Sequence, residues 1–307
     1  MGRHRKNRGR KLNGILLLDK PIGLSSNEAL QRVKRMYNAQ KAGHTGSLDP
    51  LASGLLPVCF GEATKLSAFL LDADKSYRTE CVLGEKTSTG DAEGEIIETR
   101  PIPDFSKAQI LEVLDSFVGT IEQLPPMYSA LKKDGQPLYK LARQGIEVDR
   151  AARNVTIFNI NLLANSLNRL TIDVHCSKGT YVRTLVEDIG EKLGCGAYVS
   201  SLTRNSVGVF QLRNGIGLSQ VEALRDDKAF AAMDEQIIPM ENALTDWPSI
   251  ELSDDAAYYL KQGQPVLVPK APTEGLVCLF KHKGDFLGIG QIQDDGLVAP
   301  KRLLSCA

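Results

Sequence analysis

The sequence predicts an α+β protein in which helices flank a mixed, largely antiparallel sheet. Residues 77–83 and 170–176 alternate apolar with polar side chains, which is the period of a strand with one buried face. Residues 27–37 and 106–119 instead repeat apolar side chains at the spacing of a helix. Because these segments do not follow one another as regular βαβ units, a wholly parallel sheet is disfavoured.

The composition is that of an ordinary folded protein. The chain has 307 residues, of which 42% are hydrophobic and 24% charged, a length that suits two domains or one large domain with an appendage. No apolar run reaches the roughly 20 residues of a membrane-spanning helix. The 6 cysteines show no metal-ligand spacing, and we expect neither a disulfide framework nor a signal peptide, which predicts a cytoplasmic protein.

A formal net charge of zero hides an uneven distribution. Residues 1–13 hold six basic side chains and no acid, whereas residues 214–307 hold 8 basic and 14 acidic side chains. We predict that residues 1–13 form a flexible basic arm. Such an arm is either a solvated tail or, beside a site that handles nucleic acid, an electrostatic contact for phosphates.

The N-terminal elements follow from short-range patterns. Residues 14–18 are a short apolar run that predicts a buried strand, and residues 19–23 contain the proline and glycine of a turn. Ser25 and Glu28 have the spacing of a capping box, so the apolar repeat behind them predicts a helix over residues 27–37.

Residues 43–54 form the densest cluster of unusual residues in the chain. Glycines, a proline and small side chains surround one carboxylate, Asp49, and predict a tight loop that fixes it. Pro50 biases Asp49 away from helical backbone angles. An isolated Asp-Pro pair often only caps a turn, but the density of this loop favours a chemical role for Asp49.

A second helix and its core face are predicted further along the chain. Ser106 and Gln109 have cap spacing, and Gly119 is expected to end the helix. Its predicted core stripe consists of Ile110, Leu111, Leu114, Phe117 and Val118.

Two segments stand apart from this core. Residues 125–153 are punctuated by proline and glycine and carry six basic against three acidic side chains, which predicts an exposed excursion. In the tail, a short helix near residues 254–262 and strands at 276–281 and 286–291 predict a small β module over residues 249–307.

The sequence contains few of the usual catalytic patterns. No second carboxylate, histidine cluster, GxSxG elbow or phosphate-binding P-loop accompanies Asp49, so paired-acid, metal, acyl-transfer and P-loop chemistry lack support. A carboxylate nucleophile steadied by an arginine remains. Arg183 follows a strand, a glycine turn and a helix start, where it can meet an anion. A surface ion pair with Glu187, four residues on, is the alternative for Arg183.

Five motifs then match one family in order from about residue 12 to residue 213. They are KPIG followed by Ser25, GHTGSLDPLASGLLPV with Ala63-Thr64-Lys65, KSY at residues 75–77, CSKGTYVRTLVEDIG, and GAYVSSL at residues 196–202. This series resembles the TruB family of bacterial tRNA pseudouridine synthases. The resemblance implies the pseudouridine synthase type of sheet and isomerisation of uridine 55 in the tRNA T-loop, with no metal or other cofactor.

The resemblance also implies roles for three residues in catalysis. Asp49 matches the nucleophile that lets uracil detach, rotate and rejoin the ribose through C5. Arg183 matches the arginine that pairs with this aspartate and keeps it ionised. Tyr77 matches the tyrosine that stacks on the target base and is a candidate for removing the C5 proton, although its alternation alone predicts a side chain facing the core.

Contacts to RNA are implied at further positions. His44 matches the histidine that takes the place of the flipped base, while Tyr181 and Leu202 match residues that line the uracil pocket. Lys20 and Lys65 are expected to position the RNA backbone or to brace loops. The departure from the family's Leu-Arg-Arg-Thr run at residues 202–205 puts only RNA contacts near Arg204 in doubt.

The resemblance extends to domains and partners. It implies a catalytic domain over residues 14–248, in which residues 125–153 form a mobile RNA-contacting insert, and a PUA-like RNA-binding module over residues 249–307. The implied partner is the T-arm stem-loop of tRNA, bound by a cytoplasmic monomer without an obligate protein partner.

Two other classes of function stay open on the sequence. A non-catalytic protein that binds or folds RNA would have no need of a buried pair between Asp49 and Arg183. A glycoside hydrolase with a carboxylate nucleophile would need a second carboxylate in the same pocket.

Overall fold

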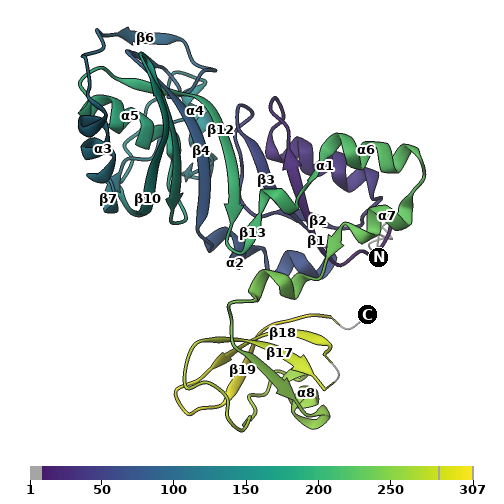
Figure 1. The fold of residues 1–307 in the computed structure, drawn as a ribbon. Helices are drawn as coiled ribbons and strands as arrows, with labels where there is room; N and C mark the ends of the chain where they lie inside the picture. Colours follow the sequence, from purple (N-terminus) through teal and green to yellow (C-terminus); the bar gives the residue numbers. More distant parts are fainter. Residues whose placement is uncertain (1–8, 283, 306–307) are drawn as a thin grey trace.

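The computed structural model describes residues 9–282 and 284–305, and its centre is one large sheet (Figure 1). Its main path runs through β14 (Ile216–Gly217), β1 (Gly14–Lys20), β3 (Ser53–Phe60), β12 (Ala197–Val207), β4 (Lys75–Leu83), β11 (Arg169–Cys176), β10 (Arg153–Ser166) and β7 (Gly119–Gln123). Three short strands join its sides, namely β2 (Ala42–His44), β13 (Phe210–Gln211) and β15 (Ile237–Ile238). Among the described residues of this sheet, only the β1·β14 and β3·β12 pairs are parallel, which confirms the predicted mixed, largely antiparallel sheet.

Helices cover the sheet and connect its strands. They are α1 (Ser26–Met36), α2 (Ser67–Asp72), α3 (Lys107–Asp115), α5 (Val182–Lys192), α6 (Leu218–Asp226) and α7 (Phe230–Glu235), with 3₁₀ turns η1 (Gly61–Lys65), η2 (Leu212–Asn214) and η3 (Met240–Leu244). Figure 1 shows α3 and α5 beside the β4, β10 and β7 end of the sheet, and α1 with α6 beside β1 and β3. The two groups of helices bury two separate apolar clusters.

The predicted strand faces and the first helix are confirmed. In β4 the side chains of Tyr77, Thr79 and Cys81 are buried while Arg78 is exposed, as the alternation requires. In α1 the Ser25 hydroxyl accepts from the Glu28 amide, which completes the predicted capping box. Strand β1 extends through Lys20, so two residues assigned to the turn belong to the strand.

The second predicted helix is shorter than expected. Its capping box forms, but α3 ends at Asp115, and Gly119 begins β7 rather than ending the helix. Leu111 and Val118 are 38% and 45% exposed, so their assignment to the core stripe was wrong. The helix packs through the narrower face of Ile110 and Leu114, and Val118 lies beyond the helix end, where the repeat no longer applies.

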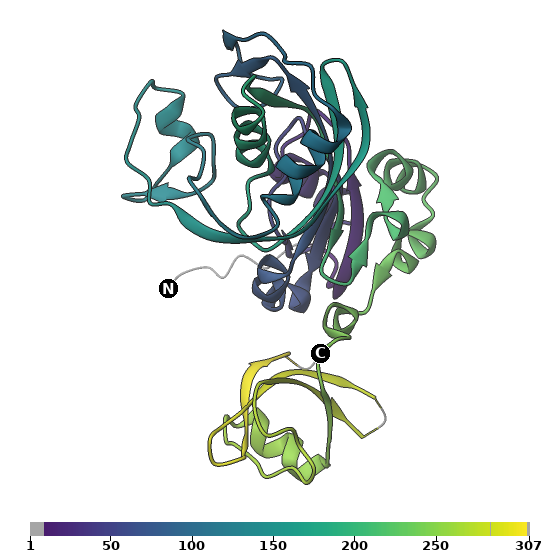
Figure 2. The ribbon, with the colours of Figure 1, turned by 60° about the vertical axis from the view of Figure 1, so that its left-hand side comes forward.

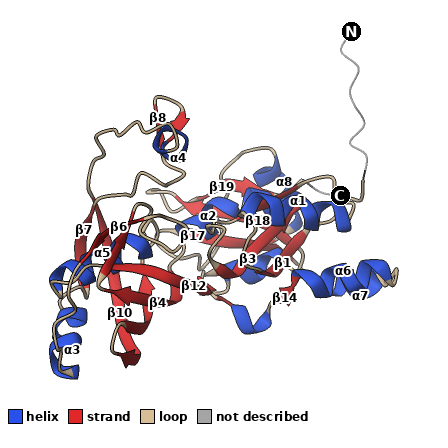
Figure 3. Cartoon of the chain, turned by 90° about the horizontal axis from the view of Figure 1, so that it is seen from above, coloured by secondary structure: helices blue, strands red, loops and turns tan. Residues whose placement is uncertain are grey.

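Residues 125–153 leave the sheet as the sequence predicts. Between β7 and β10 they form β8 (Lys132–Lys133), β9 (Gln136–Pro137) and α4 (Leu138–Ala142), and Figures 2 and 3 show this lobe standing away from the sheet. Arg150 donates to the Pro125 carbonyl at 3.0 Å and so joins the two ends of the insert. A separate small antiparallel hairpin follows β4 in the chain and consists of β5 (Glu85–Thr87) and β6 (Ile96–Thr99).

The tail forms a second sheet with the predicted elements. It contains β16 (Ser249–Leu252), α8 (Asp254–Lys261), β17 (Leu276–Lys281), β18 (Phe286–Ile292) and β19 (Val298–Leu303), and Figure 1 shows it below the large sheet. Apolar residues from both parts, including Met240 and Ile289, share one cluster. The fold is therefore α+β with a small C-terminal β module.

Most of the predicted basic arm, residues 1–8, lies outside the described residues. Arg10 is held by the body of the protein: its guanidinium pairs with Asp234, and its backbone amide donates to the Asn38 carbonyl at 2.6 Å. The end of the predicted arm is thus attached to the core and not part of a flexible tail.

Candidate active site

A cavity of about 480 Å³ lies between the loop that joins β2 to β3, the start of β4, the N-terminus of α5 and the insert. Its wall contains six of the eight residues that the sequence predicts as site residues: His44, Asp49, Tyr77, Tyr181, Arg183 and Leu202. These residues come from distant parts of the chain, so the fold has brought the predicted motifs to one place. The volume is in the range of pockets that bind one small-molecule-sized group.

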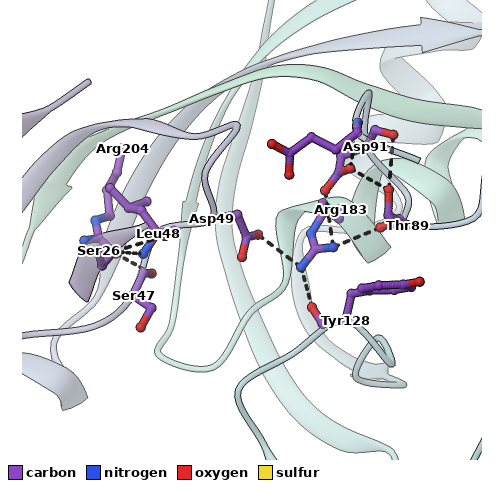
Figure 4. Close-up of polar contacts among 10 residues, drawn as sticks. Ser26, Ser47, Leu48, Asp49, Thr89, Asp91, Tyr128, Arg183 and Arg204 are labelled. Carbon is purple, nitrogen blue, oxygen red and sulfur yellow. Dashed lines mark hydrogen bonds and ion pairs between the residues drawn. The ribbon is translucent and has the colours of Figure 1, made fainter. Parts of the chain in front are cut away.

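Arg183 lies at the centre of the polar contacts in this cavity (Figure 4). Its Nη2 is 3.0 Å from Oδ2 of Asp49, and its Nη1 is 3.3 Å from Oδ2 of Asp91. The same two nitrogens donate to the carbonyls of Tyr128, at 2.7 Å, and Thr89, at 2.9 Å. Two carboxylates and two carbonyls therefore fix the guanidinium, and Arg183 in turn orients the carboxylate of Asp49.

Asp91 is a second carboxylate that the sequence analysis missed. Its side chain is only 4% exposed, and its Oδ1 accepts from the Thr89 hydroxyl and from the Glu93 amide. It does not belong to the cavity wall, because Arg183 separates it from the cavity. The alternative ion pair between Arg183 and Glu187 does not form, and the Arg183 side chain is buried at 6% exposure.

The pKa of Asp49 is raised above its usual range. Loss of water around the carboxylate is the main cause, and the negative charge of Asp91 adds to it. Arg183 and Lys20 lower the pKa of Asp49 and offset part of this rise. Arg183 therefore favours the ionised form, as the resemblance implies, although burial outweighs it.

Two buried side chains hold the Asp49 loop from opposite sides. Ser26, the first residue of α1, donates its hydroxyl to the Leu48 carbonyl at 3.0 Å and accepts from the Leu48 amide at 2.6 Å. Arg204 of β12, which is 1% exposed, donates to the carbonyls of Gly46, Ser47 and Leu55. The backbone groups of the loop are therefore held by side chains from a helix and a strand.

The Ser26 contact leads to a first prediction. Ser26→Ala leaves the buried Leu48 amide and carbonyl without their partner, so the free energy of unfolding should fall by about 1–3 kcal/mol. Activity should fall as well, because Leu48 precedes Asp49. Chemical denaturation and a rate assay check both effects. Ser53→Ala, which removes a side-chain contact to Thr203 at the other end of the loop, is the control; an equal loss of activity there would contradict the specific role of Ser26.

Gly54 gives a second prediction, because β3 meets β12 there. A Cβ added to Gly54 would lie 2.5 Å from the Arg204 carbonyl oxygen, and its φ is +98°. Gly54→Ala should therefore lower the free energy of unfolding by about 2 kcal/mol or more. Gly23→Ala is the matched control, since Gly23 also has a positive φ, +86°, but nothing lies within 4 Å of its added Cβ. Equal losses in thermal denaturation would show that strain in φ, and not the close approach, sets the effect.

Tyr77 lies both in the core and in the cavity wall. It is 9% exposed, belongs to the core cluster under the sheet, and also lines the cavity beside Leu202. Burial raises the pKa of the Tyr77 phenol, and the positive charge of Arg204 offsets part of the rise. Tyr181 lines the opposite wall, where the guanidinium of Arg153 lies 4.9 Å from its ring centre.

Of the remaining predicted site residues, His44 lines the cavity, whereas Lys20 and Lys65 do not. His44 lies at the end of β2 in the cavity wall, and burial together with Arg204 lowers its pKa, so its ring is neutral at neutral pH. Lys20 is fully buried behind the loop, where its Nζ donates to the carbonyls of Pro21 and Leu24, which fits a loop-bracing role. Lys65 does not line this cavity; it bonds Glu62 and the Leu303 carbonyl, and so joins η1 to β19 of the C-terminal module.

Beyond Asp91, the structure adds residues that sequence reasoning did not assign to the site. Lys75, Tyr128, Ser129 and Arg204 all line the cavity. Tyr128 and Ser129 belong to the insert, so this segment forms part of the site as well as an excursion. Arg204 was treated only as an RNA contact, but the alternation of buried Leu202, Arg204 and Ser206 in β12 could have shown that it faces inward.

Residues 9–282 and 284–305 contain no group of three or more His, Cys, Asp or Glu side chains placed to hold a metal ion. In the same part of the chain, no helix has the length and apolar character needed to cross a membrane.

Comparison with known proteins assigns this chain to one class, the pseudouridylate synthases. Residues 34–182 match the family model described as the TruB family pseudouridylate synthase N-terminal domain. Residues 183–245 and 248–304 match two C-terminal domain models of the same group, described as tRNA pseudouridylate synthase B and pseudouridine synthase II TruB. The chain belongs to the TruB family, and it is an isomerase that modifies RNA.

Individual relatives support this assignment over the whole chain. A protein named tRNA pseudouridine synthase B from Nitrosococcus oceani is 54% identical over 304 residues, covering 99% of this chain and 98% of the relative. Proteins of the same name from Ectopseudomonas mendocina and Coxiella burnetii are 54% and 52% identical over 295 residues. Each match covers 96% of this chain and 96% of the relative.

Solved structures agree with the fold. A structure of an H/ACA RNP bound to a substrate RNA containing 2'-deoxyuridine has a TM-score of 0.74 at 25% identity, with 95% of this chain and 85% of that chain covered. A Cbf5-Nop10-Gar1 complex gives 0.73 at 26% identity, with 94% and 84% covered.

Proposed function

We propose that the protein is a tRNA pseudouridine synthase that converts uridine 55 of the T-loop to pseudouridine. The observation that carries this proposal is the ion pair of Asp49, which faces the cavity, with the buried guanidinium of Arg183. The names of the relatives support tRNA as the substrate, and the motif series of the sequence supports position 55.

In the proposed reaction the target uridine flips out of the T-loop into the cavity. His44 fills the place that the base leaves, since a flat and neutral ring can stack there. Tyr77, Tyr181 and Leu202 enclose the uracil. This arrangement exposes the glycosidic bond to Asp49 and excludes most of the surrounding water.

Asp49 is the proposed nucleophile. Its carboxylate oxygen bonds to C1′ as the N1–C1′ bond breaks and the electron pair leaves on uracil; the base then turns, and C5 bonds to C1′ as the bond between Asp49 and C1′ breaks. The proton on C5 leaves last while N1 takes up a proton, and Tyr77 is the proposed relay for the C5 proton. These steps need no redox change and no added atom, so we propose that the enzyme uses no cofactor and no metal ion.

The two alternatives from the sequence are less well supported by the geometry. A non-catalytic RNA-binding protein gives no reason for the costly burial of Asp91 and Arg183 beside Asp49. A glycoside hydrolase needs its second carboxylate in the pocket, but Arg183 separates Asp91 from the cavity.

We further propose the division into domains and the partners. Residues 14–248 act as the catalytic domain, residues 125–153 contact the T-arm, and residues 249–307 form a PUA-like RNA-binding module. We propose that the protein acts in the cytoplasm as a monomer without an obligate protein partner.

The insert gives a prediction for RNA binding. Lys132 and Lys140 are exposed on it and free to meet phosphates of the T-arm. Each change to glutamine should reduce the slope of log affinity against log salt by about one unit. Filter binding at several salt concentrations measures the slope. Lys107→Gln, on α3 away from the insert, should leave it unchanged, and equal slopes for all variants would contradict a role of the insert in RNA contact.

Site-specific detection of pseudouridine tests the proposed function. An unmodified tRNA transcript and its T-arm stem-loop are incubated with the protein, and each uridine is examined by chemical labelling and primer extension. We expect pseudouridine at position 55 in both RNAs. Modification at another uridine, or in a transcript whose position 55 is cytidine, would overturn the assignment of the substrate.

A further inference from the structure

Two cations in the cavity wall are held mainly by carbonyl groups. Lys75, which is 7% exposed, donates its Nζ to the carbonyls of Leu71 and Ala73. Arg204, which is 1% exposed, donates to carbonyls of the Asp49 loop. Within the part of the chain that the structure describes, neither side chain forms an ion pair with a carboxylate.

Lys75 and Arg204 differ in this respect from Arg183, the third cation in the cavity wall. Asp49 and Asp91 neutralise the charge of Arg183, so little of that charge acts on the rest of the cavity. Carbonyl groups satisfy the hydrogen bonds of Lys75 and Arg204 but leave their net positive charge in place. Burying such a charge costs several kcal/mol as an order of magnitude, and its field is strong where water is scarce.

The two charges act on the same region of the cavity. Burial first and then the charge of Arg204 lower the pKa of Lys75 to about 8, at which the ammonium is still charged at neutral pH. Arg204 also adds to the lowering of the His44 pKa, and it offsets part of the rise in the Tyr77 pKa. The cavity wall formed by Tyr77, Lys75 and Arg204 therefore has a positive potential, which the nearby carboxylates of Asp74 and Asp72 offset only in part.

The reaction offers one anion at this place. When the N1–C1′ bond breaks, its electron pair stays on uracil, and the negative charge spreads over N1, O2 and O4 until C5 bonds to C1′. Fixed charges that are in place before this anion forms stabilise it without reorganisation, which is the usual origin of a large catalytic effect.

We propose that Lys75 and Arg204 stabilise the uracil anion after it detaches from the ribose. This proposal rests on the proposed function, because it requires that uracil detaches in this cavity. It gives Lys75 and Arg204 an electrostatic role that the nucleophile, its arginine partner and the stacking residues do not have.

Lys75 is the better position for a test, because Arg204 also holds the Asp49 loop. The test compares single-turnover rates on stem-loops that carry uridine or 5-fluorouridine at the target position, measured as disappearance of the starting nucleoside. Fluorine withdraws electrons, so 5-fluorouracil is a better leaving anion and depends less on outside stabilisation. Both RNAs are first shown to react with the wild-type protein; if neither does, the proposed function fails and not this inference.

We expect Lys75→Met to slow the reaction of uridine on the order of 100-fold and that of 5-fluorouridine by about tenfold or less. Lys75→Arg, which keeps the charge, should recover most of the rate. Lys107→Met, an exposed lysine on α3, is the control and should change neither rate. A partly unfolded sample lowers both rates by one factor, so the ratio of the two rates stays informative.

Two results would overturn the proposal. One is an equal loss on uridine and 5-fluorouridine, which would make Lys75 a purely structural residue. The other is an unchanged single-turnover rate with weaker RNA binding, which would mean that Lys75 meets a phosphate of the bound RNA.

Discussion

Asp49→Asn is expected to reduce pseudouridine formation by a factor of about 10⁴ or more, because an amide cannot act as the nucleophile. The change keeps the size of the side chain, and Arg183 retains its ion pair with Asp91 and its two carbonyl acceptors. The fold and the affinity for the stem-loop should therefore stay close to those of the wild type. Single-turnover assays with excess enzyme, together with filter binding, separate the two quantities.

The matched control for this variant is Asp104→Asn. Asp104 is exposed in the segment before α3 and does not line the cavity, so its change should leave the rate unaffected. Product formed by Asp49→Asn at the wild-type rate would exclude Asp49 as the nucleophile. Loss of RNA binding together with loss of product would instead place Asp49 in substrate binding.

Arg183→Met is expected to have the second-largest effect, on the order of 10³-fold in rate at neutral pH, because the nucleophile loses its orienting partner. It also leaves Asp91, which is 3% exposed, as a buried carboxylate without its cation. Breaking a buried ion pair on one side costs about 3–5 kcal/mol, so the free energy of unfolding should fall by this amount. Arg213→Met, on an exposed 3₁₀ turn, is the control and should change neither quantity.

The pH dependence distinguishes lost orientation from general damage. Asp49 acts as a carboxylate, so the rate falls as the pH is lowered through its pKa, which burial has already raised. Arg183 lowers this pKa whereas Asp91 raises it, so removal of Arg183 raises the pKa further. The acidic limb of the pH–rate profile should move to higher pH in Arg183→Met. An acidic limb at the wild-type position would contradict the electrostatic coupling of the two residues.

The elements that the sequence predicted best are those with local causes. Helix α1 has its capping box and its apolar repeat within a dozen residues, and β4 and β11 each carry a full alternation, so tertiary contacts had little to add. In α3 the apolar pattern includes residues that do not pack against the sheet. Only the position of the sheet shows that Leu111 points to solvent.

The site was predictable where a motif surrounds the residue and not where only the fold brings residues together. Asp49 stands in a loop whose glycines and proline mark it, and the motif around Arg183 is as distinct. Asp91 has no such setting, because its partner Arg183 lies far along the chain and only the pairing of distant segments joins them. Lys75 and Arg204 are buried by the same long-range packing, which a search for catalytic motifs does not consider.

The central claim is that Asp49 and its surroundings isomerise a uridine of tRNA without releasing the base. The most direct measurement is mass spectrometry of an unmodified T-arm stem-loop after incubation with the protein, with analysis of both the intact RNA and the free bases. The account predicts an RNA of unchanged mass in which uridine 55 has become pseudouridine, and no free uracil. Free uracil with an abasic RNA would show a hydrolase, and an RNA that is bound but still contains uridine 55 would show a binding protein; either result would contradict the account.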